Sequence, residues 1–316
     1  RKNMSEKIKV ALVGSGWGGI KHLDAYKKTE RADIAGICTL DDKKEELEKN
    51  YSCPVFKDFT EMLDRVKPDT VCLCLPPHTH GDFEYTLIER GIPFFVEKPL
   101  ANNLDLALDI ASKIESAGIM TMVGYMYRYR ESIVRAKDIL KDQKISLACG
   151  GWICKAPASH AWLTRKDRSG GQLVEQSTHI VDLLRYFFGE FTEQKAVYTT
   201  GFREESETYK ADDASCFTLK TESGTVATVL SSWTSGAHKR IFLDLLGPEI
   251  ALRFSEWDFN LTITHADGAE ETVKNEKNPF EIEADIWSRA VSEKNPGLIL
   301  SDYADALKTL KITLSA

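Results

Sequence analysis

The sequence has no apolar run close to the ~20 residues that a membrane-spanning helix needs, so an integral membrane protein is not expected. The first residues, 1–7, lack the apolar core of a signal peptide. Long blocks of Lys and Arg are also missing, and the formal net charge is −7. Because nucleic-acid binding needs clustered basic side chains, we expect a cytoplasmic protein whose partners are small molecules, with no nucleic acid and no membrane.

The seven cysteines form no C-x-x-C pair and no disulfide-like framework, which fits a reducing compartment. Cys72, Cys74, His78 and His80 lie close enough in sequence to suggest zinc ligands. The two cysteines, however, alternate with aliphatic residues in an apolar run typical of a buried strand, and their spacing matches no tetrahedral site. We therefore predict no metal.

The chain has 316 residues, more than one core usually serves, so two domains are expected. Up to residue 125, short apolar runs alternate with helical patterns, which predicts βαβ units and a doubly wound parallel sheet of the Rossmann type. Strands are predicted at 8–13, 33–38, 70–75, 93–97 and 119–123, and helices at 17–28, 42–50, 78–90 and 104–116.

After Gly124 the pattern changes. Strands with hairpin turns follow, and they predict a large, mostly antiparallel open sheet with one polar and one apolar face, in an α/β domain. Helices are predicted near 131–140, 172–188, 280–291 and 303–314. We expect a dinucleotide-binding domain over 1–125 and a substrate-binding or oligomerisation domain over 126–316, whose last helix can pack back on the first domain.

Gly14, Gly16 and Gly19 form a G-x-G-x-x-G pattern between a predicted strand and a predicted helix, with Trp17 inside it. This places backbone amides and a helix N-terminus where a pyrophosphate can bind. The alternative is a glycine-rich connection without a ligand. The βαβ unit around the pattern favours a nicotinamide dinucleotide.

The choice between NAD and NADP depends on the end of the second strand. Thr39 stands near the position where a carboxylate would meet the adenosine ribose, and Asp41 serves if the strand end is shifted by two residues. A threonine beside Lys43 or Lys44 instead accepts a 2′-phosphate. Both cofactors stay open.

Glu97-Lys98-Pro99 directly follows a buried strand, at the edge of the sheet where α/β proteins place ligands. Lys98 is either a solvated surface charge or a group aimed into a cleft. Its position, and the proline that stiffens the loop, favour the second.

The helix predicted over 172–188 carries one polar stripe. At 100° per residue, Glu175, His179, Asp182 and Tyr186 fall within about 60° of one another. The stripe is either a solvated face or a proton-transfer face on which Glu175 or Asp182 orients the imidazole.

Taken together, these motifs resemble the Gfo/Idh/MocA family, which includes glucose-fructose oxidoreductase and inositol dehydrogenase. The match covers nearly the whole chain, in order. It rests on GSGWGG at 14–19, PPHTH at 76–80, VEKPL at 96–100, GGQLVEQSTHIVDL at 170–183 and DYADALKTL at 302–310.

The resemblance implies that Lys98 contacts the reacting substrate oxygen and that His179 exchanges a proton with the substrate hydroxyl. Glu175 stands where the family usually has an aspartate, which keeps the charge but lengthens the reach. The resemblance also implies that the open sheet serves oligomerisation, so a homo-oligomer, dimer or tetramer, is expected. Beside the cofactor we expect Pro76, His80 and Glu97.

The expected activity is NAD(P)-dependent hydride transfer at a secondary hydroxyl or ketone of a sugar, sugar acid or cyclitol. A neutral imidazole takes the hydroxyl proton, and a lysine cation stabilises the alkoxide. The alternatives are a redox-neutral lyase or hydrolase, a non-catalytic dinucleotide sensor, and a sugar-binding or assembly protein. Substrate contacts are expected from Tyr127, Lys166, Arg168 and Asp182, although the loop before the helix can equally be solvated.

Overall fold

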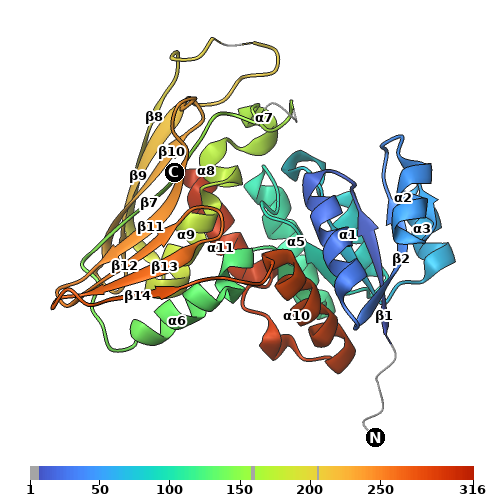
Figure 1. Cartoon of the computed structure of the whole chain (residues 1–316). Coiled ribbons are helices and arrows are strands. Elements are labelled where there is room, and N and C mark those ends of the chain that lie inside the picture. Colours follow the sequence, from blue (N-terminus) through green and yellow to red (C-terminus); the bar gives the residue numbers. More distant parts are fainter. Residues whose placement is uncertain (1–6, 158–160, 205) are drawn as a thin grey trace, which may run out of the picture. The chain divides into compact units, whose positions relative to one another are not determined.

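The computed structural model describes residues 7–157, 161–204 and 206–316, and the chain forms two compact units (Figure 1). The first comprises Arg1–Met126 with Lys277–Leu307, and the second comprises Tyr127–Glu276 with Lys308–Ala316. Lys277–Leu307 therefore belongs with the N-terminal part of the chain, beyond the expected boundary at residue 125. Among the described residues, no helix is both long and apolar enough to cross a membrane.

The first unit contains a six-stranded parallel sheet in the order β3-β2-β1-β4-β5-β6. This is the strand order of a doubly wound dinucleotide-binding fold, so the predicted fold class is confirmed. Strand β3 was not expected, because two residues are too short to show a period. The strands are β1 (Ile8–Val13), β2 (Ala32–Cys38), β3 (Val55–Phe56), β4 (Thr70–Leu73), β5 (Phe94–Val96) and β6 (Thr121–Val123).

Helices from both ends of the chain cover this sheet. Helix α10 returns to α1, where the rings of Trp17 and Phe280 meet edge to face with centroids 5.8 Å apart. The indole of Trp287 on α10 donates to the Thr70 hydroxyl of β4, at 3.1 Å. The helices are α1 (Trp17–Lys28), α2 (Lys44–Tyr51), α3 (Phe59–Val66), α4 (Asp82–Glu89), α5 (Leu104–Ala117), α10 (Pro279–Glu293) and the start of α11 (Tyr303–Ser315).

The second unit contains an eight-stranded sheet in the order β14-β13-β12-β11-β7-β10-β9-β8. Its neighbours pair antiparallel except for β7 and β10, which run parallel, so the mostly antiparallel sheet is confirmed. The strands are β7 (Leu147–Ile153), β8 (Phe191–Thr199), β9 (Ala214–Thr221), β10 (Val226–Ser232), β11 (Arg240–Leu246), β12 (Ile250–Ser255), β13 (Asn260–His265) and β14 (Glu270–Val273).

One face of this sheet packs against helices of the same unit. Phe187 of α9, for example, stacks on Phe254 of β12, with ring centroids 6.1 Å apart. The predicted helix 172–188 is divided into α8 and α9. A short helix, α7, lies in the loop that was expected before it. The helices are α6 (Glu131–Ile139), α7 (Lys166–Ser169), α8 (Gln172–Glu175), α9 (Thr178–Phe188) and the end of α11.

Candidate functional site

The glycine turn lies between β1 and α1, as predicted. Gly14 has φ +94°, and a Cβ there would lie 2.2 Å from the carbonyl oxygen of Cys74. A Cβ at Gly19 would lie 2.0 Å from the carbonyl oxygen of Gly14, so only glycine lets the helix pack this closely on the turn. The first turn of α1 carries no acidic residue, and its partial positive charge therefore suits an anion such as a pyrophosphate.

At the end of β2, a hydrogen-bonded group joins the glycine turn to Asp41. The hydroxyl of Ser15 lies 2.7 Å from that of Thr39 and donates to the Asp41 carboxylate at 2.6 Å. Thr39 is buried, whereas Asp41 is exposed. The exposed carboxylate beside the turn is therefore that of Asp41, two residues beyond the position where the motif spacing first placed it.

Lys57 binds the backbone just after the end of β2. The Lys57 ammonium donates to the carbonyl oxygens of Leu40 and Asp41, both at 2.8 Å, and pairs with Asp42 at 3.1 Å. Its charge is thus engaged by the backbone that carries Asp41. Lys43 and Lys44 are exposed.

The loop after β4 is fixed from within by His80. Its ring is buried, Nδ1 is hydrogen-bonded to the Glu84 carboxylate, and Nε2 lies 3.4 Å from the carbonyl oxygen of Leu75. The second oxygen of Glu84 accepts from the amide of Gly81 at 2.7 Å. These contacts hold the loop that carries Pro76, and the predicted contact of Pro76 and His80 with the cofactor stays a prediction.

Lys98 lies just beyond β5, half-buried, in the unit that contains the glycine turn. Its backbone amide donates to one carboxylate oxygen of Glu97 at 3.1 Å. The other oxygen of Glu97 lies 2.7 Å from Nε2 of His22 on α1. Glu97 therefore fixes the backbone at Lys98, a role that the sequence did not predict.

His179 lies near the start of α9 in the second unit and is 5% exposed. The indole of Trp152 stacks on its ring at a centroid distance of 5.9 Å, and Tyr127 meets it edge to face at 5.2 Å. The Tyr127 hydroxyl donates to the carbonyl of Trp257 at 3.1 Å, and burial raises the pKa of that phenol. These aromatic side chains fix the orientation of the imidazole.

The helix break changes how Glu175 relates to His179. Gln176 and Ser177 separate α8 from α9, and their side chains bond elsewhere: Gln176 accepts from the Trp233 indole at 2.8 Å, and the Ser177 hydroxyl lies 2.7 Å from that of Ser231. The expected i,i+4 relation on one continuous helix is therefore wrong, because the backbone turns between the two residues. The role of Glu175 beside the imidazole stays a prediction.

Asp182 belongs to a buried ion pair rather than to an exposed face. Arg128 donates to both of its carboxylate oxygens, at 2.8 and 2.6 Å, and both side chains are almost fully buried. The hypothesis of a solvated stripe on this helix is wrong for His179 and Asp182. Arg128 binds both oxygens of Asp182, and a substrate contact from Asp182 stays a prediction.

The predicted cationic contacts of the loop lie at the surface of the second unit. Lys166 is exposed, pairs with Asp212 at 2.6 Å and lies over the ring of Tyr198. Arg168 is also exposed. Residues 158–160 of this loop, including His160, lie outside the described part of the chain. A substrate contact from Lys166 or Arg168 stays a prediction.

The structure does not bring together the four residues considered as zinc ligands, Cys72, Cys74, His78 and His80. Cys72 and Cys74 lie in and just after β4, and their sulfurs are 3.6 Å apart. They approach His22 instead of His78, which is exposed. The sequence patterns did not indicate His22, which lies beside Glu97, or Ser15, which donates to Asp41. The signal that could have indicated His22 is its position on the buried face of the helix, one turn after the G-x-G-x-x-G pattern.

Two family models match the chain. The model described as the oxidoreductase family with an NAD-binding Rossmann fold matches residues 8–125. The model of the GFO/IDH/MocA C-terminal domain matches residues 144–253. The two matches fall in order on the first and second units and together cover more than half of the chain.

Curated relatives are similar at low identity. D-apiose dehydrogenase of Paraburkholderia graminis is 25% identical over 280 residues, which is 83% of this chain and 71% of that protein. The scyllo-inositol 2-dehydrogenase (NAD(+)) of Bacillus subtilis is 26% identical over 259 residues, 78% of this chain and 73% of that protein. The uncharacterised Schizosaccharomyces pombe protein UNK4.17 is 30% identical over 154 residues, and only 37% of its length is matched.

Solved structures share the fold. Levoglucosan dehydrogenase in complex with NADH and L-sorbose has a TM-score of 0.86 at 20% identity, covering 98% of this chain and 95% of that one. UDP-N-acetylglucosamine 3-dehydrogenase from Acidithiobacillus ferrooxidans has a TM-score of 0.83 at 16% identity, covering 98% and 97%.

Proposed function

The chain belongs to the Gfo/Idh/MocA family of oxidoreductases, and we propose that it transfers a hydride between NAD and a secondary hydroxyl, or the matching ketone, of a sugar, sugar acid or cyclitol. The observation that carries the proposal is the anchoring of Lys98 at the end of β5, in the unit that contains the glycine turn. Relatives named as dehydrogenases of D-apiose and scyllo-inositol support the substrate class.

The roles divide between two side chains. Bound NAD supplies the hydride acceptor for oxidation of the alcohol carbon. His179 takes the hydroxyl proton, because an imidazole can accept a proton near neutral pH. Lys98 supplies an ammonium group that stabilises the negative charge of the developing alkoxide. The products are a ketone, NADH and one proton.

We further propose NAD rather than NADP as the physiological cofactor. The exposed Asp41 carboxylate is held beside the glycine turn by a hydrogen bond from the Ser15 hydroxyl. In this position it can accept from the hydroxyls of an adenosine ribose. A 2′-phosphate would meet its negative charge. The nearby Lys57 ammonium is engaged by backbone carbonyls and Asp42, so it supports the strand end rather than a phosphate.

The experiment measures turnover of a panel of polyols and sugars from the absorbance of the NADH formed, in the wild type and in Lys98→Met. Loss of the cation is expected to lower kcat by about 10²–10³-fold while NAD still binds. The control is Lys113→Met, an exposed lysine on α5. Unchanged turnover of Lys98→Met would refute the proposal, and turnover without net NADH would indicate a redox-neutral reaction instead.

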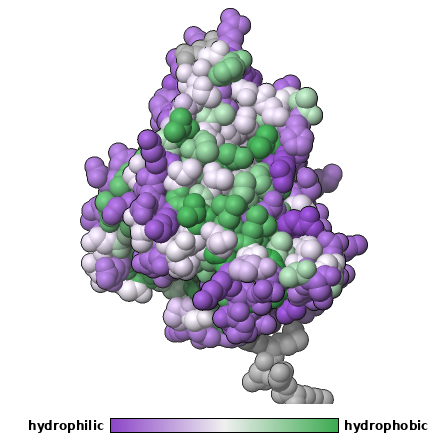
Figure 2. Space-filling view, turned by 90° about the vertical axis from the view of Figure 1, so that its left-hand side faces the viewer, coloured by the Kyte–Doolittle hydropathy of each residue, from purple (hydrophilic) through white to green (hydrophobic). Residues whose placement is uncertain are grey.

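The outer face of the eight-stranded sheet supports a homo-oligomer. Leu147, Val226 and Leu246 are paired side by side across β10, β7 and β11, and each is exposed. Figure 2 shows apolar side chains gathered on this face and bordered by hydrophilic ones. Burial of these side chains in a second copy would remove apolar area from water.

A further inference from the structure

A group of titratable side chains lies inside the first unit, behind the loop that carries Lys98. It joins His22 of α1, Glu97 after β5 and Glu283 of α10, and we call it the buried triad. One ring nitrogen and one oxygen from each carboxyl group lie within 4.8 Å of one another. His22 and Glu283 are each 1% exposed.

Glu97 is held on three sides. Its Oε1 lies 2.7 Å from Nε2 of His22, and its Oε2 accepts from the backbone amide of Lys98 at 3.1 Å. A Cβ at Gly124 would lie 2.9 Å from both oxygens, so the carboxylate packs directly against that backbone. A shift of Glu97 therefore moves the backbone of Lys98.

Glu283 is the unusual member. Neither of its oxygens has a hydrogen-bond partner among the residues that the structure describes. The titratable groups that face it are His22 and Tyr26 from α1, Cys72 from β4, Cys74 just after β4, and Glu97 after β5. Burial first, and the charge of Glu97 second, raise the pKa of Glu283 well above its usual value.

Two carboxyl groups this close in an apolar interior cannot both be ionised at low cost, since like charges there repel strongly and burial disfavours each charge. His22 faces Glu97 and can share one proton with it. The second acid stays uncharged only by retaining its own proton.

We propose that Glu283 carries a proton in the folded protein at neutral pH, so that it adds no negative charge beside Glu97, and that His22 and Glu283 are positioning residues for Lys98. The positioning role rests on the proposed function, in which Lys98 contacts the reacting oxygen. A second negative charge at Glu283 would repel Glu97 and draw its carboxylate away from the Lys98 amide.

The same side chains offer atoms to a divalent cation, but the geometry favours the proton. Two ligands of one tetrahedral ion, each bound at about 2.1 Å, lie about 3.4 Å apart. The nitrogen of His22 and the oxygen of Glu97 are 2.7 Å apart, which is a hydrogen-bond distance. That bond places a proton between them, where a metal would need the nitrogen lone pair.

The first test is the pH dependence of stability for Glu283→Gln, which replaces the protonated acid by a neutral isostere. A group whose pKa is raised on folding costs stability as pH rises above its unfolded value, about 4.5, until the folded value is passed. Wild type is therefore expected to lose stability from pH 5 to pH 8 relative to Glu283→Gln. The relative unfolding constant changes by up to about tenfold per pH unit.

The matched control is Glu281→Gln, on the same helix but in a surface ion pair with Lys28, and it should show no such trend. A stability difference between Glu283→Gln and wild type that stays constant over this range would overturn the proton assignment. So would a stoichiometric metal ion in purified wild-type protein that is lost in Glu283→Gln.

The second test is kinetic. His22→Phe and Gly124→Ala should each lower kcat about tenfold or more with little change in the KM for NAD, because each change displaces the Glu97 carboxylate from the Lys98 amide. Glu283→Gln and His22→Gln, which keep the shape or a donor, should retain most of kcat. If Lys98→Met is inactive but His22→Phe and Gly124→Ala keep wild-type kcat, positioning is wrong. If Lys98→Met is fully active, the proposed function fails, whereas the stability test still stands.

Discussion

The second unit contains a buried pair of opposite charges, whereas the first unit contains a buried group of two carboxyl groups and one imidazole. In the second unit, the Arg128 guanidinium faces the Asp182 carboxylate with two donors at 2.8 and 2.6 Å. In the first, Glu283 and Glu97 share the neighbourhood of His22. The pair of Arg128 and Asp182 is neutral without any proton added. The group around His22 avoids a second negative charge only because one carboxyl group keeps its proton.

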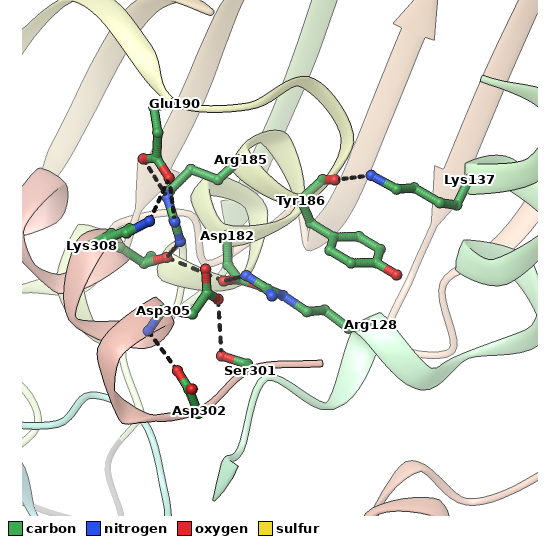
Figure 3. A network of polar contacts seen from close by, with 11 residues as sticks. Arg128, Lys137, Asp182, Arg185, Tyr186, Glu190, Ser301, Asp302, Asp305 and Lys308 are labelled. Atoms are coloured by element: carbon green, nitrogen blue, oxygen red, sulfur yellow. Dashed lines mark hydrogen bonds and ion pairs between the residues drawn. The ribbon is translucent and has the colours of Figure 1, made fainter. Parts of the chain in front are cut away.

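Figure 3 shows the polar network around the ion pair of Arg128 and Asp182, which we call the paired cluster. Thr309 of α11 accepts from Arg185 at 2.8 Å and donates to Asp182 at 3.1 Å. Arg185 in turn donates to both oxygens of Glu190, at 3.0 and 2.7 Å. The network therefore ties α9 to the end of α11 and to the segment that carries Arg128.

The difference separates structural charges from functional ones. Both oxygens of Asp182 accept from the Arg128 guanidinium, so this carboxylate contributes to the packing of its unit. An acid with a strongly perturbed pKa and no counter-charge is typical of functional sites. The buried triad contacts the loop of Lys98, whereas the paired cluster connects helices.

The largest effect is expected where a matched pair is broken. Asp182→Asn removes the carboxylate charge and leaves the Arg128 guanidinium buried, which typically costs about 3–5 kcal/mol. Urea unfolding followed by tryptophan fluorescence measures this loss. The same carboxyl-to-amide change in Glu283→Gln is expected to be neutral or stabilising at pH 8. If the two variants change stability equally, the contrast between the two clusters is wrong.

A smaller effect is expected from the bridging hydroxyl. Thr309→Val keeps the shape of the side chain but removes an acceptor for Arg185 and a donor for Asp182, both buried. Losing hydrogen bonds to charged partners typically costs about 1–3 kcal/mol. The same unfolding experiment measures it, with Thr313→Val as control, since that hydroxyl donates only to backbone carbonyls of α11. A loss no larger than that of the control would mean that the hydroxyl does not couple the two ions.

The sequence was a good guide where a pattern is local. The strand, turn and helix around Gly14, and the alternation of strands and helices in the first unit, followed from periodicity. The break at Gln176 and Ser177 could not be foreseen, because it depends on partners in and beyond β10 that lie more than fifty positions away. The same holds for Asp182 and Glu283. Asp182 meets Arg128 and Thr309, and Glu283 meets His22 and Glu97. No spacing rule connects these distant parts of the sequence.

The smallest effect is expected at the edge of the paired cluster. Lys308 lies 3.7 Å from Glu190, but the two side chains are 59% and 41% exposed, so water and salt screen their attraction. Lys308→Gln is expected to change the free energy of unfolding by at most about 0.5 kcal/mol, and less in high salt. A loss comparable to that of Asp182→Asn, measured in the same urea series, would show that stability follows the number of ion pairs. The structure instead makes burial decisive, because Lys308 and Thr309 are neighbours in sequence yet face water and the buried ions respectively.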